Sequence, residues 1–95
     1  MGLQFEWDPN KAASNLRRHR VSFEEAATVF EDRLSVTVAD PDHSLEEERW
    51  ITVGMSHSAR LLMVSHTERG DHIRVISARA LTPRERKVYE ERKWS

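Results

Sequence analysis

The chain has no cysteine among its 95 residues. It therefore cannot hold a disulfide scaffold, a thiolate metal site or a cysteine nucleophile. It also lacks any apolar run close to the roughly 20 residues needed to span a bilayer. Its first residues have neither the basic segment nor the apolar core of a signal peptide. We therefore expect a cytoplasmic protein with a single domain over residues 1–95.

Neither sign of charge dominates, because the net charge is −1, but the charges are unevenly distributed. Residues 1–20 carry +2, residues 21–50 carry −7 and residues 51–95 carry +4. If the two basic ends meet in the fold, they form a basic face that can bind phosphate. The alternative is that the lysines and arginines only solvate helix faces.

The first third of the chain predicts one short strand and two helices. Residues 3–7 alternate apolar and polar side chains, as a half-buried strand does. Asp8 and the proline after it are start signals for a helix that runs to about residue 20. On that helix we expect Ala12, Leu16 and His19 to share a face. The spacing of Ser22 and the glutamate three residues later predicts a capping box for a second helix.

The rest of the chain predicts four strands and a last helix. The strands fall at residues 34–38, 50–55, 61–67 and 73–80. Short turns between consecutive strands favour an antiparallel meander. In the last strand, simple alternation puts Val75, Ser77 and Arg79 on one face. Thr82 and Glu85 form a second capping box, which begins a C-terminal helix that runs to about residue 93. The order β-α-α-β-β-β-β-α indicates an α+β fold.

Several blocks of the sequence, in their order and spacing, resemble the BrnT family of toxins. They include Phe5-Glu6-Trp7-Asp8, Asn10-Lys11, Asn15, His19, Phe23-Glu24-Glu25-Ala26, His43-Ser44, Arg74-Val75-Ile76-Ser77-Ala78-Arg79, Glu85-Arg86 and Tyr89. The match covers nearly the whole chain. One departure is Arg20, where the family usually has glycine. This implies that the turn after the first helix is made without a left-handed glycine, or one residue later.

The resemblance implies a RelE-like fold and a metal-independent endoribonuclease that inhibits translation as the toxin of a type II toxin–antitoxin system. It also implies a BrnA-like antitoxin that neutralises the toxin, and a complex, in which the toxin could dimerise, that represses its own operon. Operator DNA would be contacted only through the antitoxin, and no cofactor is implied. A non-catalytic antitoxin-binding subunit with a degenerate nuclease site is the alternative. A metal-dependent nuclease is disfavoured because the sequence has no clustered carboxylate or Cys/His motif.

RNA cleavage without metal needs a base for the ribose 2′-OH, cations for the phosphorane and an acid for the leaving 5′-oxygen. His19 is a candidate base or acid, because imidazole exchanges protons near neutral pH. The alternative is a helix-end histidine packed on the sheet. Arg79 alternates with core residues, so it should be paired or functional. The alternative for Arg79 is a salt bridge to an acid such as Glu47 or Glu48.

The other candidates carry weaker signals. The further catalytic candidates are Arg60, Lys11 and Tyr89, and the RNA-binding candidates are Arg17, Arg18, Arg74 and Arg86. Lys11 opposes the dipole of its helix, although exposed lysines are common, and the Tyr89 ring could simply pack on the sheet. His43 and Glu47 could form a carboxylate–imidazole pair, or could cap a loop. No zinc-like spacing of histidines is present, so no metal site is expected.

Overall fold

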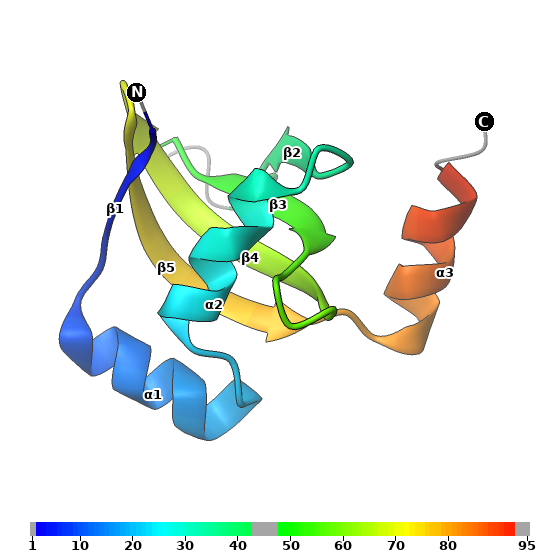
Figure 1. Ribbon diagram of the computed structural model, residues 1–95, viewed down its shortest axis with the longest axis horizontal. Helices are drawn as coiled ribbons and strands as arrows, with labels where there is room; N and C mark the ends of the chain where they lie inside the picture. Colours follow the sequence, from blue (N-terminus) through cyan, green and yellow to red (C-terminus); the bar gives the residue numbers. More distant parts are fainter. Residues whose placement is uncertain (1, 43–47, 93–95) are drawn as a thin grey trace.

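A computed structural model describes residues 2–42 and 48–92, which form one five-stranded sheet with three α-helices (Figure 1). The elements in chain order are β1 (Gln4–Glu6), α1 (Pro9–His19), α2 (Phe23–Thr28), the 3₁₀ turn η1 (Val29–Glu31), β2 (Val36–Ala39), β3 (Trp50–Met55), β4 (Leu61–Arg69), β5 (His72–Ala80) and α3 (Pro83–Arg92). The predicted α+β class and element order are confirmed. His43 and Glu47 lie outside the described residues. No helix in the described part of the chain is long and apolar enough to cross a membrane.

The strand order is β1-β5-β4-β3-β2. Strands β2 to β5 pair antiparallel with their chain neighbours, so the predicted meander is confirmed. The short β1 pairs in parallel with β5, which places the start of the chain beside its last strand (Figure 1). β1 pairs only with the first three residues of β5. The helix α1 also packs against β5.

A β-bulge in β5 changes which of its side chains share a face. Val75 pairs with His66, but the next paired residue of β5 is Ser77, opposite Ser65, so Ile76 is an extra residue. After the bulge, Ala78 joins Val75 in the core, with both side chains buried. The prediction that Val75 and Arg79 share a face is therefore wrong. Strict alternation fails because a bulge inserts one unpaired residue.

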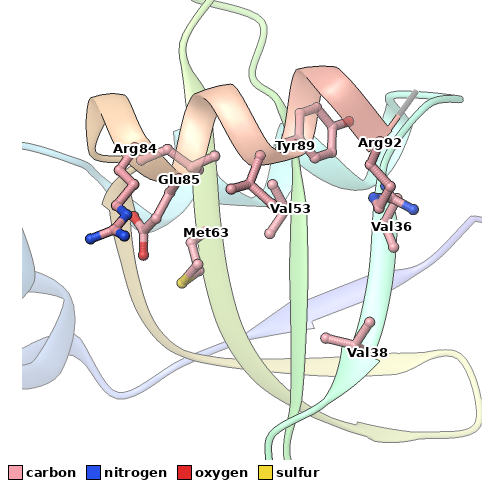
Figure 2. A pocket seen from close by; sticks show the side chains of 10 residues that line it. Val36, Val38, Val53, Met63, Arg84, Glu85, Tyr89 and Arg92 are labelled. Atoms are coloured by element: carbon pink, nitrogen blue, oxygen red, sulfur yellow. The ribbon is translucent and has the colours of Figure 1, made fainter. Parts of the chain in front are cut away.

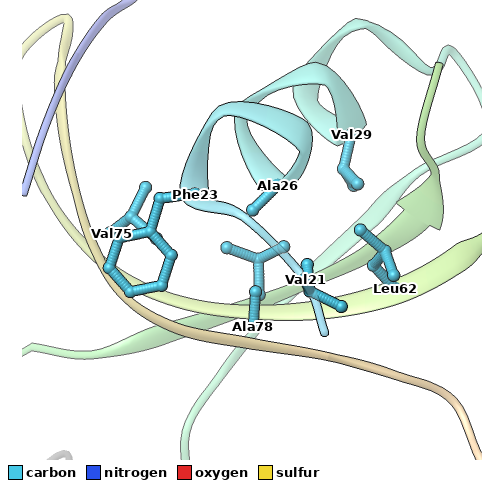
Figure 3. Close-up of a cluster of buried hydrophobic side chains, with 8 residues drawn as sticks. Val21, Phe23, Ala26, Val29, Leu62, Val75 and Ala78 are labelled. Atoms are coloured by element: carbon cyan, nitrogen blue, oxygen red, sulfur yellow. The ribbon is translucent and has the colours of Figure 1, made fainter. Parts of the chain in front are cut away.

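The core lies between the sheet and α2 (Figure 3). Ser22 Oγ accepts a hydrogen bond from the Glu25 amide at 3.0 Å, which confirms the serine half of the predicted capping box. The Glu25 carboxylate bonds Ser56 and Arg60 instead. A helix of six residues is too short to be stable alone. Its stability comes from burying its apolar stripe against β4 and β5. The packed side chains are Val21, Phe23, Ala26, Val29, Leu62, Val64, Val75 and Ala78.

The face that α1 turns to the protein differs from the expected one. Of Ala12, Leu16 and His19, only Ala12 packs against the core, while Leu16 is 49% exposed and His19 is exposed. The buried side chain of α1 is Asn15, which is 6% exposed. Hydrophobic spacing missed this face because its central residue is polar.

Asn15 is buried because it completes main-chain hydrogen bonds of two other segments. Its Nδ2 donates to the carbonyls of Ala78 at 2.8 Å and Val21 at 3.0 Å, and its Oδ1 accepts from the Ala78 amide at 3.1 Å. One side chain therefore ties α1 to β5 and to the start of α2. Each bond satisfies a group that would otherwise be buried without a partner.

The turn after α1 is made by Arg20 itself in the left-handed conformation, with φ 59°. The Arg20 amide donates to the Leu16 carbonyl at 2.9 Å, which closes the helix. The turn thus needs no glycine, as the departure from the family pattern implies. The side chain does carry a conformational cost that glycine would avoid.

A chain of polar side chains runs across β2, β3 and β4, from an exposed threonine to a buried histidine. Thr37 Oγ1 and Thr52 Oγ1 lie 2.7 Å apart, and Thr52 Oγ1 lies 2.7 Å from His66 Nε2. His66 is fully buried, and its ring also stacks edge-on against Phe30. Burial disfavours the charged imidazole and lowers the pKa of His66 from 6.5 to about 4.

This shift predicts acid sensitivity. The unfolded chain binds the His66 proton below pH 6.5, whereas the folded chain resists it until about pH 4. The free energy of unfolding should therefore fall as the pH is lowered from 6.5 to about 4, by up to roughly 3 kcal/mol. Urea unfolding at several pH values should show a smaller fall for His66→Gln, and an unchanged one for the exposed control His57→Gln. Identical pH profiles for wild type and His66→Gln would contradict the assignment.

Replacing Asn15 by leucine should leave three main-chain groups without partners. We expect a loss of about 2–4 kcal/mol in the free energy of unfolding, measured by urea titration. The same replacement at the exposed Asn10 should cost less than about 1 kcal/mol. Equal effects at both positions would show that Asn15 does not hold α1 to the sheet.

Replacing Arg20 by glycine should raise the free energy of unfolding by roughly 0.5–1 kcal/mol, because glycine adopts the left-handed turn without strain. Arg18→Gly, inside α1, is the matched control and should lower it by about 1 kcal/mol. Thermal unfolding of both variants measures the contrast. A loss of stability in both variants would argue against a left-handed Arg20.

Candidate functional site

Three adjoining hollows form a continuous trough on the face of the sheet that α2 does not cover. The first and second share Lys11 and Ile76, and the second and third share His19 and Ser77. We call this surface the basic trough. Its polar lining residues include Glu6, Lys11, Ser14, Arg18, His19, Arg49, Ser65, Thr67, Arg69, His72, Arg74, Ser77 and Arg79.

The cations of the trough come largely from the two basic ends of the chain. Lys11 and Arg18 project from α1, and Arg69 and Arg74 lie at the facing ends of β4 and β5. The parallel pairing of β1 with β5 and the Asn15 contacts of α1 bring these elements together. The two ends therefore meet and form a basic surface, as one reading of the charge pattern predicts.

The trough cations differ in how far they are neutralised. Arg74 Nη1 lies 2.9 Å from Glu6 Oε2 in an exposed ion pair. Within residues 2–42 and 48–92, Lys11, Arg18 and Arg69 have no acidic partner. Unpaired cations in a hollow attract anions more strongly than paired ones. The trough therefore suits a phosphate backbone better than a neutral ligand.

His19 and Arg79 line the same hollow, at one end of the trough. His19 comes from the last turn of α1, and Arg79 comes from β5 after the bulge. Ser65 and Ser77, which pair across β4 and β5, line the same hollow. His19 is exposed rather than packed on the sheet. A titratable ring, a guanidinium and two hydroxyls thus share one open site.

The Arg79 guanidinium is paired with Glu85. Nη1 donates to Oε1 at 2.8 Å, and Nη2 donates to Oε2 at 2.9 Å. This ion pair lowers the pKa of Glu85 to about 2 and raises that of Arg79. The partner is neither of the acids considered from the sequence. Glu85 Oε1 also accepts from the Thr82 amide at 2.9 Å, which confirms the predicted capping box of α3.

Arg60 has a different set of partners, away from the trough. Its Nε donates to Glu25 Oε2 at 2.9 Å, and its Nη2 donates to the Arg20 carbonyl at 3.0 Å. Ser56 Oγ donates to the same Glu25 oxygen at 2.7 Å. The hydrogen bond from Arg60 lowers the pKa of Glu25. Arg60 therefore ties the β3–β4 hairpin to α2 and the α1–α2 turn. Arg86 lines a separate hollow beside Arg60.

Tyr89 is a residue of α3 and lines an apolar groove between this helix and the sheet, not the trough (Figure 2). Its side chain is buried, and its hydroxyl donates to the Leu34 carbonyl at 2.8 Å. Burial raises the pKa of Tyr89. The groove has a volume of about 410 Å³, and Val36, Val53 and Met63 form its floor. Tyr89 thus packs over the sheet, as the alternative reading has it.

Of the nine residues singled out from the sequence, five line the trough, namely Lys11, Arg18, His19, Arg74 and Arg79. The others, Arg17, Arg60, Arg86 and Tyr89, line none of its hollows. Sequence reasoning missed Asn15, Ser65, Arg69 and Glu85 as parts of the site. Two of them carried a signal, because Asn15 was among the residues of the family resemblance and Glu85 was assigned to the capping box. Among the described residues, no group of three or more histidine, aspartate or glutamate side chains is placed to hold a metal ion.

The fold is similar to the crystal structure of the Brucella abortus ribonuclease toxin BrnT, determined at 1.1 Å. The TM-score is 0.62 at 18% sequence identity, over 84% of this chain and 97% of that chain. At this identity, the likeness concerns the fold alone. No curated protein matches the chain in sequence.

Family membership is shown by a sequence model that matches most of the chain. Residues 7–85 match the family described as "Ribonuclease toxin, BrnT, of type II toxin-antitoxin system". This range includes α1, the sheet from β2 to β5 and the first turn of α3. It therefore includes every residue of the hollow shared by His19 and Arg79. The chain belongs to the BrnT family of ribonuclease toxins of type II toxin–antitoxin systems.

Proposed function

We propose that this protein is a metal-independent endoribonuclease that inhibits translation by cleaving RNA in the cytoplasm. The observation that carries this proposal is the shared hollow of His19 and Arg79, at the end of a trough that Lys11, Arg18 and Arg69 also line. Family membership supports ribonuclease chemistry in general. The choice of residues is our own inference from their arrangement.

In the proposed reaction, the ribose 2′-oxygen attacks the adjacent phosphorus and the 5′-oxygen leaves. A base must take the 2′-proton, and an acid must give a proton to the leaving oxygen. His19 is the trough residue best suited to one of these transfers, because it is exposed and lines the same hollow as Arg79. Which of the two transfers it performs stays open.

Cations would stabilise the extra negative charge on the phosphorane. A guanidinium can donate two parallel hydrogen bonds to phosphate oxygens, so Arg79 suits the reacting phosphate. Lys11, Arg18 and Arg74 would hold flanking phosphates along the trough, with Arg69 extending it. These contacts position the RNA backbone without reading its sequence. We propose no catalytic contact for Arg60, Arg86 or Tyr89.

Type II systems pair the toxin with a protein antitoxin, and the family implies one here. We propose that the partner is BrnA-like, that it neutralises the toxin and that it carries the DNA-binding part of a repressor complex. The toxin would then reach operator DNA only through its partner, in a complex that could contain two toxin chains.

A non-catalytic antitoxin-binding subunit is the second candidate. One observation favours this candidate: the Arg79 guanidinium donates two hydrogen bonds to Glu85, so these donors are not free to bind phosphate. An inactive member of the family would bind its antitoxin and leave RNA intact. Cleavage by the purified chain decides between the two candidates.

The test is incubation of the purified chain with RNA in EDTA. We expect cleavage, and we expect His19→Ala to slow it by roughly 10²–10⁴-fold, the usual contribution of a general acid or base. Arg79→Ala should also slow it, whereas the exposed His57→Ala serves as the matched control and should not. Gel analysis of end-labelled RNA gives the rates.

Three results would contradict the proposal in different ways. Loss of cleavage on chelation would make the reaction metal-dependent. Full activity in His19→Ala would remove the histidine from the chemistry. No cleavage by a folded wild-type chain would favour the non-catalytic subunit.

A further inference from the structure

The Arg79 guanidinium has almost no free donor left. A guanidinium has five N–H groups. Glu85 takes one from each terminal nitrogen, the Ala80 carbonyl lies 3.3 Å from Nη1, and Met63 Sδ lies 3.4 Å from Nη2. Only the Nε–H group has no partner in these contacts. Arg79 can therefore offer at most one hydrogen bond to a phosphate while the Glu85 contact lasts.

A carboxylate and a phosphate use the same geometry on a guanidinium, two oxygens against two parallel N–H groups. The two Glu85 oxygens therefore occupy the positions that two phosphate oxygens would take. Their charge also cancels that of Arg79. Because the Glu85 pKa is about 2, the carboxylate stays ionised near neutral pH and is not removed by protonation.

The pair stands at the border between the basic trough and the groove under α3. Arg79 lines the trough, and Met63 lines both the trough and the groove. Glu85 and Met63 line the groove in Figure 2. Glu85 lies in the first turn of α3, whose C-terminal half is held by the hydrogen bond from Tyr89 to Leu34. The groove leaves about 410 Å³ between the helix and the sheet. The Glu85 side chain is thus held on a helix that packs loosely on the sheet.

We propose that Glu85 is an internal competitor of RNA, whose carboxylate occupies the phosphate position on Arg79 and must be displaced when RNA binds. This inference rests on the proposed RNA-binding role of the trough. Glu85 acts through Arg79 and makes no contact with RNA itself. The Glu85 carboxylate therefore lowers the affinity of the free protein for RNA. The other cations of the trough attract the RNA backbone before Arg79 binds it.

Glu85→Gln is a sharp test, because glutamine keeps the side-chain length and suits the same capping position but has no charge. The probe is a short fluorescent single-stranded RNA with 2′-methoxy groups, which cannot be cleaved through the 2′-oxygen. Glu91→Gln is the matched control, since it removes the same charge from an exposed position on the same helix. Circular dichroism checks that α3 persists in both variants.

We expect Glu85→Gln to bind the probe about fivefold more tightly than wild type, since a partly exposed ion pair contributes about 1 kcal/mol. Glu91→Gln should gain less than twofold. The gain should vanish when Arg79 is also replaced by alanine. Equal gains in the two single variants would reduce the effect to net charge and overturn the proposal.

Weaker or unchanged binding by Glu85→Gln would also overturn the proposal, and weaker binding would make Glu85 a positioning residue for Arg79. The proposal is also overturned if neither wild type nor the variant binds the probe. The readout needs no cleavage, so it separates this inference from the proposed activity. An Arg79-dependent gain in a chain that never cleaves RNA would support the competitor and contradict the nuclease.

Discussion

The candidate site depends on the hydrogen bonds between Asn15 and the main chain of Ala78. These bonds join positions 63 residues apart and meet β5 just after its bulge. The bulge turns Arg79 toward the trough, and the Asn15 amide holds the last turn of α1 beside it. Without the bulge, strict alternation would turn Arg79 to the core face, and without Asn15 the helix end that carries His19 would lose its anchor.

The uneven charge of the sequence also has a structural meaning. The trough collects cations from both basic ends. Carboxylates hold two further arginines, Arg60 outside the trough and Arg79 at its end. Glu25 fixes Arg60 between three chain segments, and Glu85 fixes Arg79 at the start of α3. Lys11 and Arg18 have no such partner in the described part of the chain. A net charge near zero therefore coexists with a surface suited to phosphate.

The sequence was sufficient for features that depend on local chemistry. The capping serine of α2, the capping box of α3 and the meander were all predictable, because each follows from residues close together in the chain. A turn after α1 without a left-handed glycine was foreseen as one of two options, but the left-handed conformation of Arg20 itself was not. Helix periodicity misplaced the buried face of α1, because Asn15 is polar and its partners are distant main-chain groups. The bulge and the Arg79–Glu85 pair were likewise invisible, since both depend on tertiary packing. The sequence predicted a basic surface only on the condition that the two basic ends of the chain meet in the fold.

The most direct test of this arrangement is a crystal structure of the chain with an RNA whose 2′-hydroxyls are methylated. Our account predicts a phosphate within hydrogen-bond distance of both His19 and Arg79, with the neighbouring phosphates beside Lys11 and Arg18. RNA bound on another surface, with the hollow between His19 and Arg79 empty, would contradict it.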